Sequence, residues 1–247
     1  MISAAIAEPL IEPPNSGAMK TNILCSKRTL VMNNKEQRHM RELIIGIKTV
    51  IPVITIYDTR HAEDLAKALV AGGLFVFEIV LRTDCALRAV EIMARAVPEA
   101  KVGMGTVMNA AQIDQARNAG AAFGVSPGLT PRLVEALRDR DWPFLPGVQT
   151  ASEVMAASEA GFRELKLFPA NLVGGVSWLR FMRPIFPDVA FFPTGGIKSE
   201  EVPTYLAEAN CCAVGGSWVV PADEIRARNW RAIEALALQA AALGKST

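Results

Sequence analysis

Short apolar runs alternate with longer amphipathic segments from about residue 50 to the end of the chain. A run of roughly four to eight apolar residues is typical of a strand buried on both faces of a parallel sheet, whereas apolar residues recurring every three or four positions indicate a helix. The pattern predicts eight strands, at residues 50–56, 75–81, 101–106, 122–126, 143–147, 164–168, 189–194 and 211–216.

The amphipathic segments predict one helix after each strand, and a further short helix over residues 34–48 leads into the first strand. Eight β-α units in succession predict an α/β protein built as a single (β/α)₈ TIM barrel with a short N-terminal helix. A doubly wound open sheet is the alternative, but no GxGxxG motif follows the first strand, which disfavours a dinucleotide-binding domain. The helices are expected at residues 62–72, 85–97, 110–120, 130–140, 150–161, 175–186, 199–209 and 229–243.

Residues 1 to about 35 are rich in Pro, Asn and Ser and have no hydrophobic periodicity, so we expect a flexible N-terminal extension before a barrel domain at 36–247. The extension lacks the charged start and clean apolar run of a signal peptide. No apolar stretch of the chain reaches the roughly 20 residues that a membrane span requires.

Composition narrows the function classes. The net charge is +1 and the charges are scattered, so no basic patch indicates nucleic acid or an anionic membrane as a partner. The four Cys and two His form no CxxC or other metal-ligand spacing. We therefore expect no metal, no cofactor and no disulfide framework, and a reducing cytoplasmic location.

Lys166 is the most informative candidate because it lies in the middle of the apolar strand ELKLF. One interpretation is an exposed lysine whose long stem covers apolar surface. The other is a buried amine, which loses its charge more readily than an exposed one and can attack a ketone to form a Schiff base.

Alternation along the strands places further charges beside Lys166. In FVFEIVLR, residues 75, 77, 79 and 81 face the helices, so Glu78 and Arg82 face the barrel interior, as does Lys166 on its own strand. Lys166 and Glu78 could form a structural ion pair, although a buried pair is a poor source of stability. Alternatively, Glu78 could move protons.

Glycine pairs follow the seventh and eighth strands, in FFPTGGI and AVGGSWVVP. The loops after these two strands are the usual phosphate site of a TIM barrel, and glycines let backbone N–H groups approach an anion. A short helix near Ser217 would add its dipole. Thr106 and the Ser126-Pro127-Gly128 turn also fall at strand ends, where barrel enzymes keep their sites, but each taken alone is more often a turn than a site.

Seven motifs together resemble the 2-keto-3-deoxy-6-phosphogluconate (KDPG) aldolase family, class I aldolases that also cleave 4-hydroxy-2-oxoglutarate. They are EIVLRTDCA, VGMGTV, SPGLTP, LPGVQT, ELKLFPA, FFPTGGI and GGSWVVPAD. The resemblance runs from about residue 48 to about 243 and omits the N-terminal extension. It departs from the family at ANLVGG, which follows Phe168-Pro169.

The resemblance implies a role for each matched residue. Lys166 would be the Schiff-base lysine and Glu78 the general acid and base, while Arg82 and Thr106 would bind the substrate carboxylate. Pro127 and Phe168 would line the pyruvate pocket. The phosphate contacts would fall on Thr194, Gly195, Gly196, Gly215, Gly216 and Ser217.

The implied reaction is cleavage of KDPG, a phosphorylated 2-keto acid of the Entner–Doudoroff pathway, to pyruvate and glyceraldehyde 3-phosphate by a homotrimer. Three rival functions remain. The first is the same reaction on the galactonate-series isomer. The second is a metal-dependent pyruvate aldolase or decarboxylase, and the third is a non-catalytic phosphosugar-binding barrel.

Overall fold

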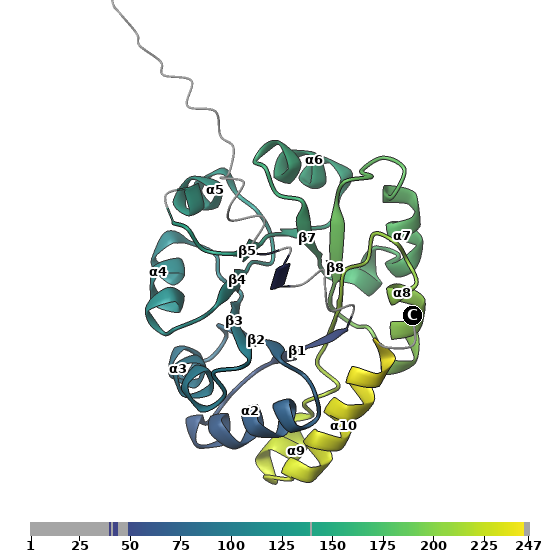
Figure 1. Ribbon diagram of the computed structural model, residues 1–247. Helices are drawn as coiled ribbons and strands as arrows, with labels where there is room; N and C mark the ends of the chain where they lie inside the picture. Colours follow the sequence, from purple (N-terminus) through teal and green to yellow (C-terminus); the bar gives the residue numbers. More distant parts are fainter. Residues whose placement is uncertain (1–39, 41, 44–48, 139, 245–247) are drawn as a thin grey trace, which may run out of the picture.

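The computed structural model describes residues 40, 42–43, 49–138 and 140–244. Its strands are all parallel, and they curl around an apolar interior with the helices on the outside (Figure 1). The helices therefore do not cover both faces of an open sheet, as the doubly wound alternative requires. The expected 1–35 extension, and with it the boundary at residue 36, lies outside the described residues; Met40, Glu42 and Leu43 are helical, within the expected lead-in helix.

The predicted strands all form, and most are shorter than the pattern indicated. They are β1 (Val50–Ile54), β2 (Val76–Val80), β3 (Lys101–Gly105), β4 (Phe123–Val125), β5 (Phe144–Leu145), β6 (Gly147–Val148), β7 (Glu164–Leu167), β8 (Ala190–Pro193) and β9 (Val214–Gly216). The order β5-β4-β3-β2-β1-β9 forms one sheet and β6-β7-β8 a second.

The predicted fifth strand is two short strands on either side of Pro146. Proline has no N–H to donate to a ladder, so the segment changes partner there. β5 pairs with β4, and β6 pairs with β7. The Pro146 carbonyl accepts a hydrogen bond from Lys166 N at 2.9 Å, so this segment lies beside both sheets. At the other edges of the two sheets, isolated parallel bridges join Phe191 to Cys211 and Thr194 to Gly215, between the segments that contain β8 and β9.

The helices predicted after the strands are confirmed, although the one expected at 199–209 is a 3₁₀ turn followed by a short helix, and the segment after β9 carries two. They are α2 (Ala62–Ala71), α3 (Ala86–Ala96), α4 (Ala110–Asn118), α5 (Pro131–Arg138), α6 (Ala151–Glu159), α7 (Gly175–Met182), α8 (Val202–Leu206), α9 (Ala222–Arg226) and α10 (Trp230–Leu243). Short 3₁₀ helices lie at η1 (Thr59–His61), η2 (Ala170–Val173) and η3 (Ser199–Glu201). No helix among the described residues has both the length and the apolar character to cross a bilayer.

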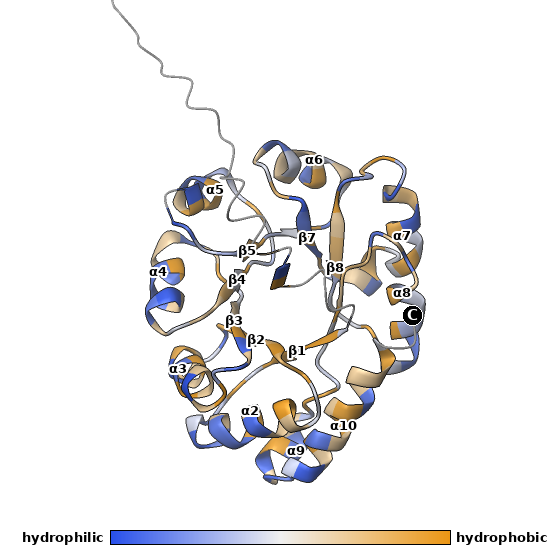
Figure 2. Cartoon of the chain, in the orientation of Figure 1, coloured by the Kyte–Doolittle hydropathy of each residue, from blue (hydrophilic) through white to orange (hydrophobic). Residues whose placement is uncertain are grey.

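Two apolar clusters reflect the strand alternation. Phe77, Ile79 and Leu165 belong to the larger cluster, between strands and helices. A smaller cluster fills the interior and includes Met40, Val76 and Phe192. Most strands are apolar, but β7 is hydrophilic in Figure 2 because it carries Glu164 and Lys166. Two buried charged residues in one strand single out β7 for a role other than packing.

Candidate active site

Lys166 and Glu78 meet on the inner side of the curled strands. Lys166 Nζ donates hydrogen bonds to Glu78 Oε1 at 2.9 Å and to Oε2 at 3.2 Å. The two side chains are only 7% and 1% exposed. The predicted inward direction and proximity of both residues are confirmed, and the exposed interpretation of Lys166 is wrong.

The ion pair lies among aromatic rings. Lys166 Nζ is 5.5 Å from the ring centroid of Phe168 and 5.9 Å from that of Phe192. Cation–π attraction partly compensates the ammonium for lost water. The two hydrogen bonds and the two rings hold the amine at one place inside the strands, beside a carboxylate that can exchange a proton with it.

Arg82 does not continue β2. The strand ends at Val80, Arg82 is exposed, and its backbone N–H donates to the Val80 carbonyl at 2.8 Å. The expectation that Arg82 lies on an inward strand position is therefore wrong, because the chain turns before reaching it. Among the described residues its guanidinium has no ion-pair partner, which leaves it available to an anion at the strand ends.

Thr106 has an unusual backbone. It directly follows β3 with φ at +64°, in the left-handed region that a β-branched residue rarely adopts. Such a conformation costs about 1–3 kcal/mol and is commonly kept at functional positions. Nearby, the Ser126 hydroxyl donates to the Gly128 carbonyl at 2.6 Å, which holds the turn that carries the exposed Pro127.

The structure gives different reasons for glycine at the four positions predicted to form the phosphate loops. Gly195 and Gly196 have φ of +103° and +76°, so their turn requires glycine. At Gly215, a Cβ would lie 2.4 Å from Thr194 Oγ1, and at Gly216 one would lie 2.8 Å from Trp218 Nε1. Gly215 and Gly216 therefore make room for neighbouring side chains, a packing reason that the sequence did not reveal.

The two hydroxyl side chains of these loops differ in exposure. Thr194 is buried, whereas Ser217 is exposed at the carboxyl end of β9. No helix begins at Ser217: a turn closes there, with Val220 N donating to the Ser217 carbonyl at 3.2 Å, and α9 starts only at Ala222. The expected helix dipole at Ser217 is therefore wrong.

Asn171 supports the loop after β8 and was missed by the sequence analysis. Its side-chain amide donates to the Gly196 carbonyl, and its backbone N–H donates to the Gly195 carbonyl at 3.2 Å. Its Oδ1 accepts a hydrogen bond from the Tyr205 hydroxyl at 2.9 Å. Burial raises the pKa of Tyr205 to about 12, so this hydroxyl remains a donor.

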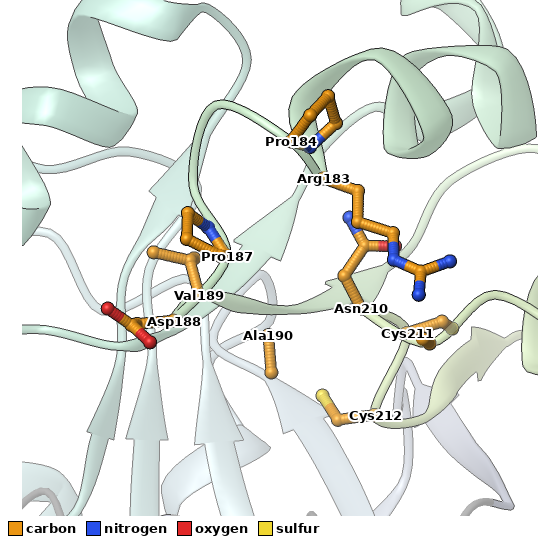
Figure 3. A pocket seen from close by; sticks show the side chains of 10 residues that line it. Arg183, Pro184, Pro187, Asp188, Val189, Ala190, Asn210, Cys211 and Cys212 are labelled. Atoms are coloured by element: carbon orange, nitrogen blue, oxygen red, sulfur yellow. The ribbon is translucent and has the colours of Figure 1, made fainter.

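A cavity of about 650 Å³ lies elsewhere, at the amino-terminal ends of β8 and β9 (Figure 3). Arg183, Asp188, Asn210 and Cys212 are among the residues that line it, and none of the predicted site residues does. The candidate site is defined by the ion pair and the strand-end loops and not by this cavity. Among the described residues, no group of three or more His, Cys, Asp or Glu side chains is placed to hold a metal ion.

The chain matches known proteins over most of its length. The family model described as KDPG and KHG aldolase matches residues 42–236. The chain is 44% identical over 208 residues to 2-dehydro-3-deoxy-phosphogluconate aldolase of Dickeya dadantii, covering 84% of this chain and 98% of that protein.

Two solved structures have the same architecture. KDPG aldolase of Zymomonas mobilis ZM4 with 3-phosphoglycerate is 44% identical, with a TM-score of 0.79 over 84% of this chain and 97% of that one. KDPG aldolase of Legionella pneumophila, with pyruvate captured as a covalent carbinolamine, is 40% identical, with a TM-score of 0.77 over 79% and 95% of the two chains. Sequence and structure agree that the chain belongs to the KDPG and KHG aldolase family.

Proposed function

We propose that this protein is a class I aldolase that cleaves KDPG to pyruvate and glyceraldehyde 3-phosphate through a Schiff base on Lys166. The observation that carries the proposal is the buried Lys166–Glu78 pair, with Nζ 2.9 Å from Oε1. The family membership gives the reaction class, and the pair supplies the two groups that the chemistry needs.

The first half of the reaction uses the pair as a proton relay. A proton passes from Lys166 Nζ to Glu78, and the neutral amine attacks the C2 ketone to give a carbinolamine. The carboxylic acid of Glu78 then protonates the departing hydroxyl, which leaves as water. The products of this stage are a protonated imine and a Glu78 carboxylate.

The second half breaks and remakes bonds at C3. Glu78, through a water molecule, takes the proton of the C4 hydroxyl, the C3–C4 bond breaks, and its electrons flow to the imine nitrogen. Glyceraldehyde 3-phosphate leaves, and an enamine remains. Glu78 returns a proton to C3, and a water molecule hydrolyses the resulting imine to release pyruvate and regenerate Lys166.

We assign substrate binding to the strand ends. The exposed guanidinium of Arg82, which has no ion-pair partner among the described residues, and the strained Thr106 suit the C1 carboxylate. Pro127 and Phe168 are assigned to the pyruvate end. Arg82 can make a bidentate contact with the carboxylate. We assign the phosphate to Thr194, Gly195, Gly196, Gly215, Gly216 and Ser217, and the tight turn with positive φ at Gly195 and Gly196 supports this assignment.

A coupled assay for pyruvate release tests the function. KDPG, its galactonate-series epimer and 4-hydroxy-2-oxoglutarate are each supplied, with and without EDTA. We expect turnover of KDPG and of 4-hydroxy-2-oxoglutarate, with no loss in EDTA. No pyruvate from any substrate would favour a non-catalytic phosphosugar-binding barrel, and faster turnover of the epimer would favour the galactonate series. Loss in EDTA restored by a divalent metal would favour the metal-dependent class.

We also propose that residues 36–247 form one closed (β/α)₈ barrel preceded by a dispensable extension. The bridges Phe191–Cys211 and Thr194–Gly215 on one side, and the 144–148 segment on the other, support closure. Met40 is 1% exposed in the interior cluster, so a chain beginning at Met40 keeps this contact. We expect that shortened chain to be soluble and active.

The protein is proposed to work as a cytoplasmic homotrimer. Among the described residues, Cys85, Cys211 and Cys212 form no disulfide, in keeping with a reducing compartment. Leu172, Phe181 and Ile185 are 83%, 75% and 60% exposed, and a protein–protein contact would cover such side chains. Light scattering tests this. We expect the wild type to have the mass of a trimer, and Phe181→Asp to dissociate at higher protein concentrations than the wild type.

A further inference from the structure

Strand β3 presents only glycine to the interior beside the ion pair. Gly103 and Gly105 face inward, whereas Val102 and Met104 pack into the outer cluster. A Cβ on Gly105 would lie 2.0 Å from Oε1, 2.7 Å from Cδ and 2.8 Å from Cγ of Glu78. The Glu78 side chain therefore occupies the space that the side chain of any other residue at position 105 would fill.

The backbone conformation does not explain this glycine. Gly195 and Gly196 have a positive φ. The φ of Gly105 is not in that range, so any residue could adopt its backbone conformation. Space is the remaining reason. Glycine in a strand interior loses packing and costs conformational entropy, and it often marks a close approach of another group.

The neighbouring position shows why the carboxylate leans towards Gly105. Glu78 is paired in register with Gly103, and Val80 with Gly105. The space above Gly103 is filled by the Phe123 ring, whose atoms would lie 2.3 Å from a Cβ there. The Phe123 ring thus fills the space beside Gly103, directly opposite Glu78. The space beside Gly105, closer to the carboxyl ends of the strands, remains for the Glu78 carboxylate.

The carboxylate has few other restraints. Among the described residues, its hydrogen-bond partner is Lys166 Nζ. Once Lys166 becomes an imine, its nitrogen has a single N–H and carries the substrate. The bare backbone of Gly105 is then the surface against which the carboxylate rests.

We propose that Gly105 is a positioning residue that holds the Glu78 carboxylate where it can exchange protons with the carbon next to the imine. This inference rests on the proposed Schiff-base function. A methyl group at position 105 would force Oε1 from 2.0 Å to an ordinary contact of 3.4 Å or more. A misplacement of about 1 Å can cost roughly a hundredfold in rate.

The test follows exchange of the pyruvate methyl protons with D₂O by NMR, a reaction that needs only the imine and its base. In Gly105→Ala we expect the exchange rate to fall by about a hundredfold. The final yield of pyruvate imine trapped with borohydride, measured after the imine has reached equilibrium, does not depend on how fast Glu78 moves protons and should stay within a few-fold of the wild type. An unchanged exchange rate would overturn the proposal, and so would a loss of trapped yield equal to the loss of exchange.

Met104→Val controls for general damage to β3. Met104 is buried in the outer cluster, whereas Glu78 faces the interior, so truncating Met104 should lower the melting temperature but not the exchange rate of folded enzyme. The same measurements on the wild type distinguish the positioning role of Gly105 from the Schiff-base function. Failure of the wild type to trap pyruvate or exchange its protons would count against the Schiff-base function itself, whatever Gly105→Ala does.

A double variant keeps the test decisive even where Gly105→Ala folds poorly. Asp is one methylene shorter than Glu, so Glu78→Asp withdraws the carboxylate from position 105. We expect Gly105→Ala to cost about a hundredfold in exchange when Glu78 is intact, but only a few-fold when it is combined with Glu78→Asp. Equal costs in the two backgrounds would show that the methyl group acts on the strand and not on the carboxylate.

Discussion

Lys166 Nζ lies almost equally close to both carboxylate oxygens of Glu78, at 2.9 and 3.2 Å, and the pair is nearly inaccessible to water. Each side chain therefore supplies most of the favourable interaction that offsets the other's loss of water. The pair is a costly arrangement for stability alone, since desolvation offsets much of the attraction. Its presence is more readily explained by chemistry, and this has separate consequences for stability and for rate.

Lys166→Met is expected to abolish turnover and to destabilise the fold by about 3–5 kcal/mol, because it leaves Glu78 buried without a partner. Adding Glu78→Gln should recover most of that stability and none of the activity. Urea unfolding of the two variants and the wild type measures this. A single variant as stable as the double variant would contradict the compensation argument.

Glu78→Gln alone should lower kcat by roughly 10²–10⁴, the usual contribution of a general acid–base group. Gln fills the same space over Gly105 but cannot accept the proton. The pyruvate imine should form more slowly but still be trapped on Lys166 by borohydride after long incubation, and peptide mapping by mass spectrometry locates the label. Label on an exposed lysine such as Lys101 or Lys198 would refute the assignment of Lys166.

Ser217→Ala tests the phosphate site without disturbing the packing of Gly216 against Trp218. Losing one hydrogen bond to a charged group is worth about 1.5–3 kcal/mol, or roughly ten- to a hundredfold in KM. We expect that rise for KDPG and little change for 4-hydroxy-2-oxoglutarate, which has no phosphate. Equal changes for both substrates would place the phosphate elsewhere.

The strand pattern predicted most of the architecture because burial imposes a period of two on every strand. That period correctly directed Glu78 and Lys166 inward from strands 88 residues apart in sequence. It failed at Arg82, since where a strand ends depends on its neighbours. It also failed at Pro146, where a missing N–H divides one strand between two sheets.

The missing parts of the site depend on contacts between distant segments. Asn171 and Tyr205 support the loop after β8 from η2 and α8, and no local motif connects them. Gly105 and Gly216 have ordinary strand positions, so only the neighbouring side chains reveal why each is glycine. At Thr106 the backbone is unusual and the residue type gives no sign of it, because a threonine in a left-handed conformation cannot be recognised from sequence.

Cys212→Ala should reduce the loss of stability at high pH. Burial, with a further effect from Glu164, raises the pKa of the Cys212 thiol from 9.0 to about 12. Because the folded-state pKa is raised, this stability is fully present below pH 9 and is lost as the pH rises towards 12. The slope is about 1.4 kcal/mol per pH unit for one proton. Urea unfolding at about pH 8 and about pH 10.5, on either side of the unfolded thiol's pKa, should show a smaller difference in the variant than in the wild type.

Thr106→Gly should separate stability from activity. Glycine adopts φ of +64° without the steric cost that a β-branched residue incurs, although it gains entropy in the unfolded chain. We expect the free energy of unfolding to rise by about 1 kcal/mol, or roughly 2–4 °C in Tm for a domain of this size. The hydroxyl assigned to the substrate carboxylate is lost, so KM should rise for KDPG and for 4-hydroxy-2-oxoglutarate alike, since both carry that carboxylate. Thermal unfolding and steady-state kinetics on one preparation measure both effects. A variant that is less stable and fully active would show that Thr106 is kept for the fold, and that its left-handed backbone is not strain held for binding.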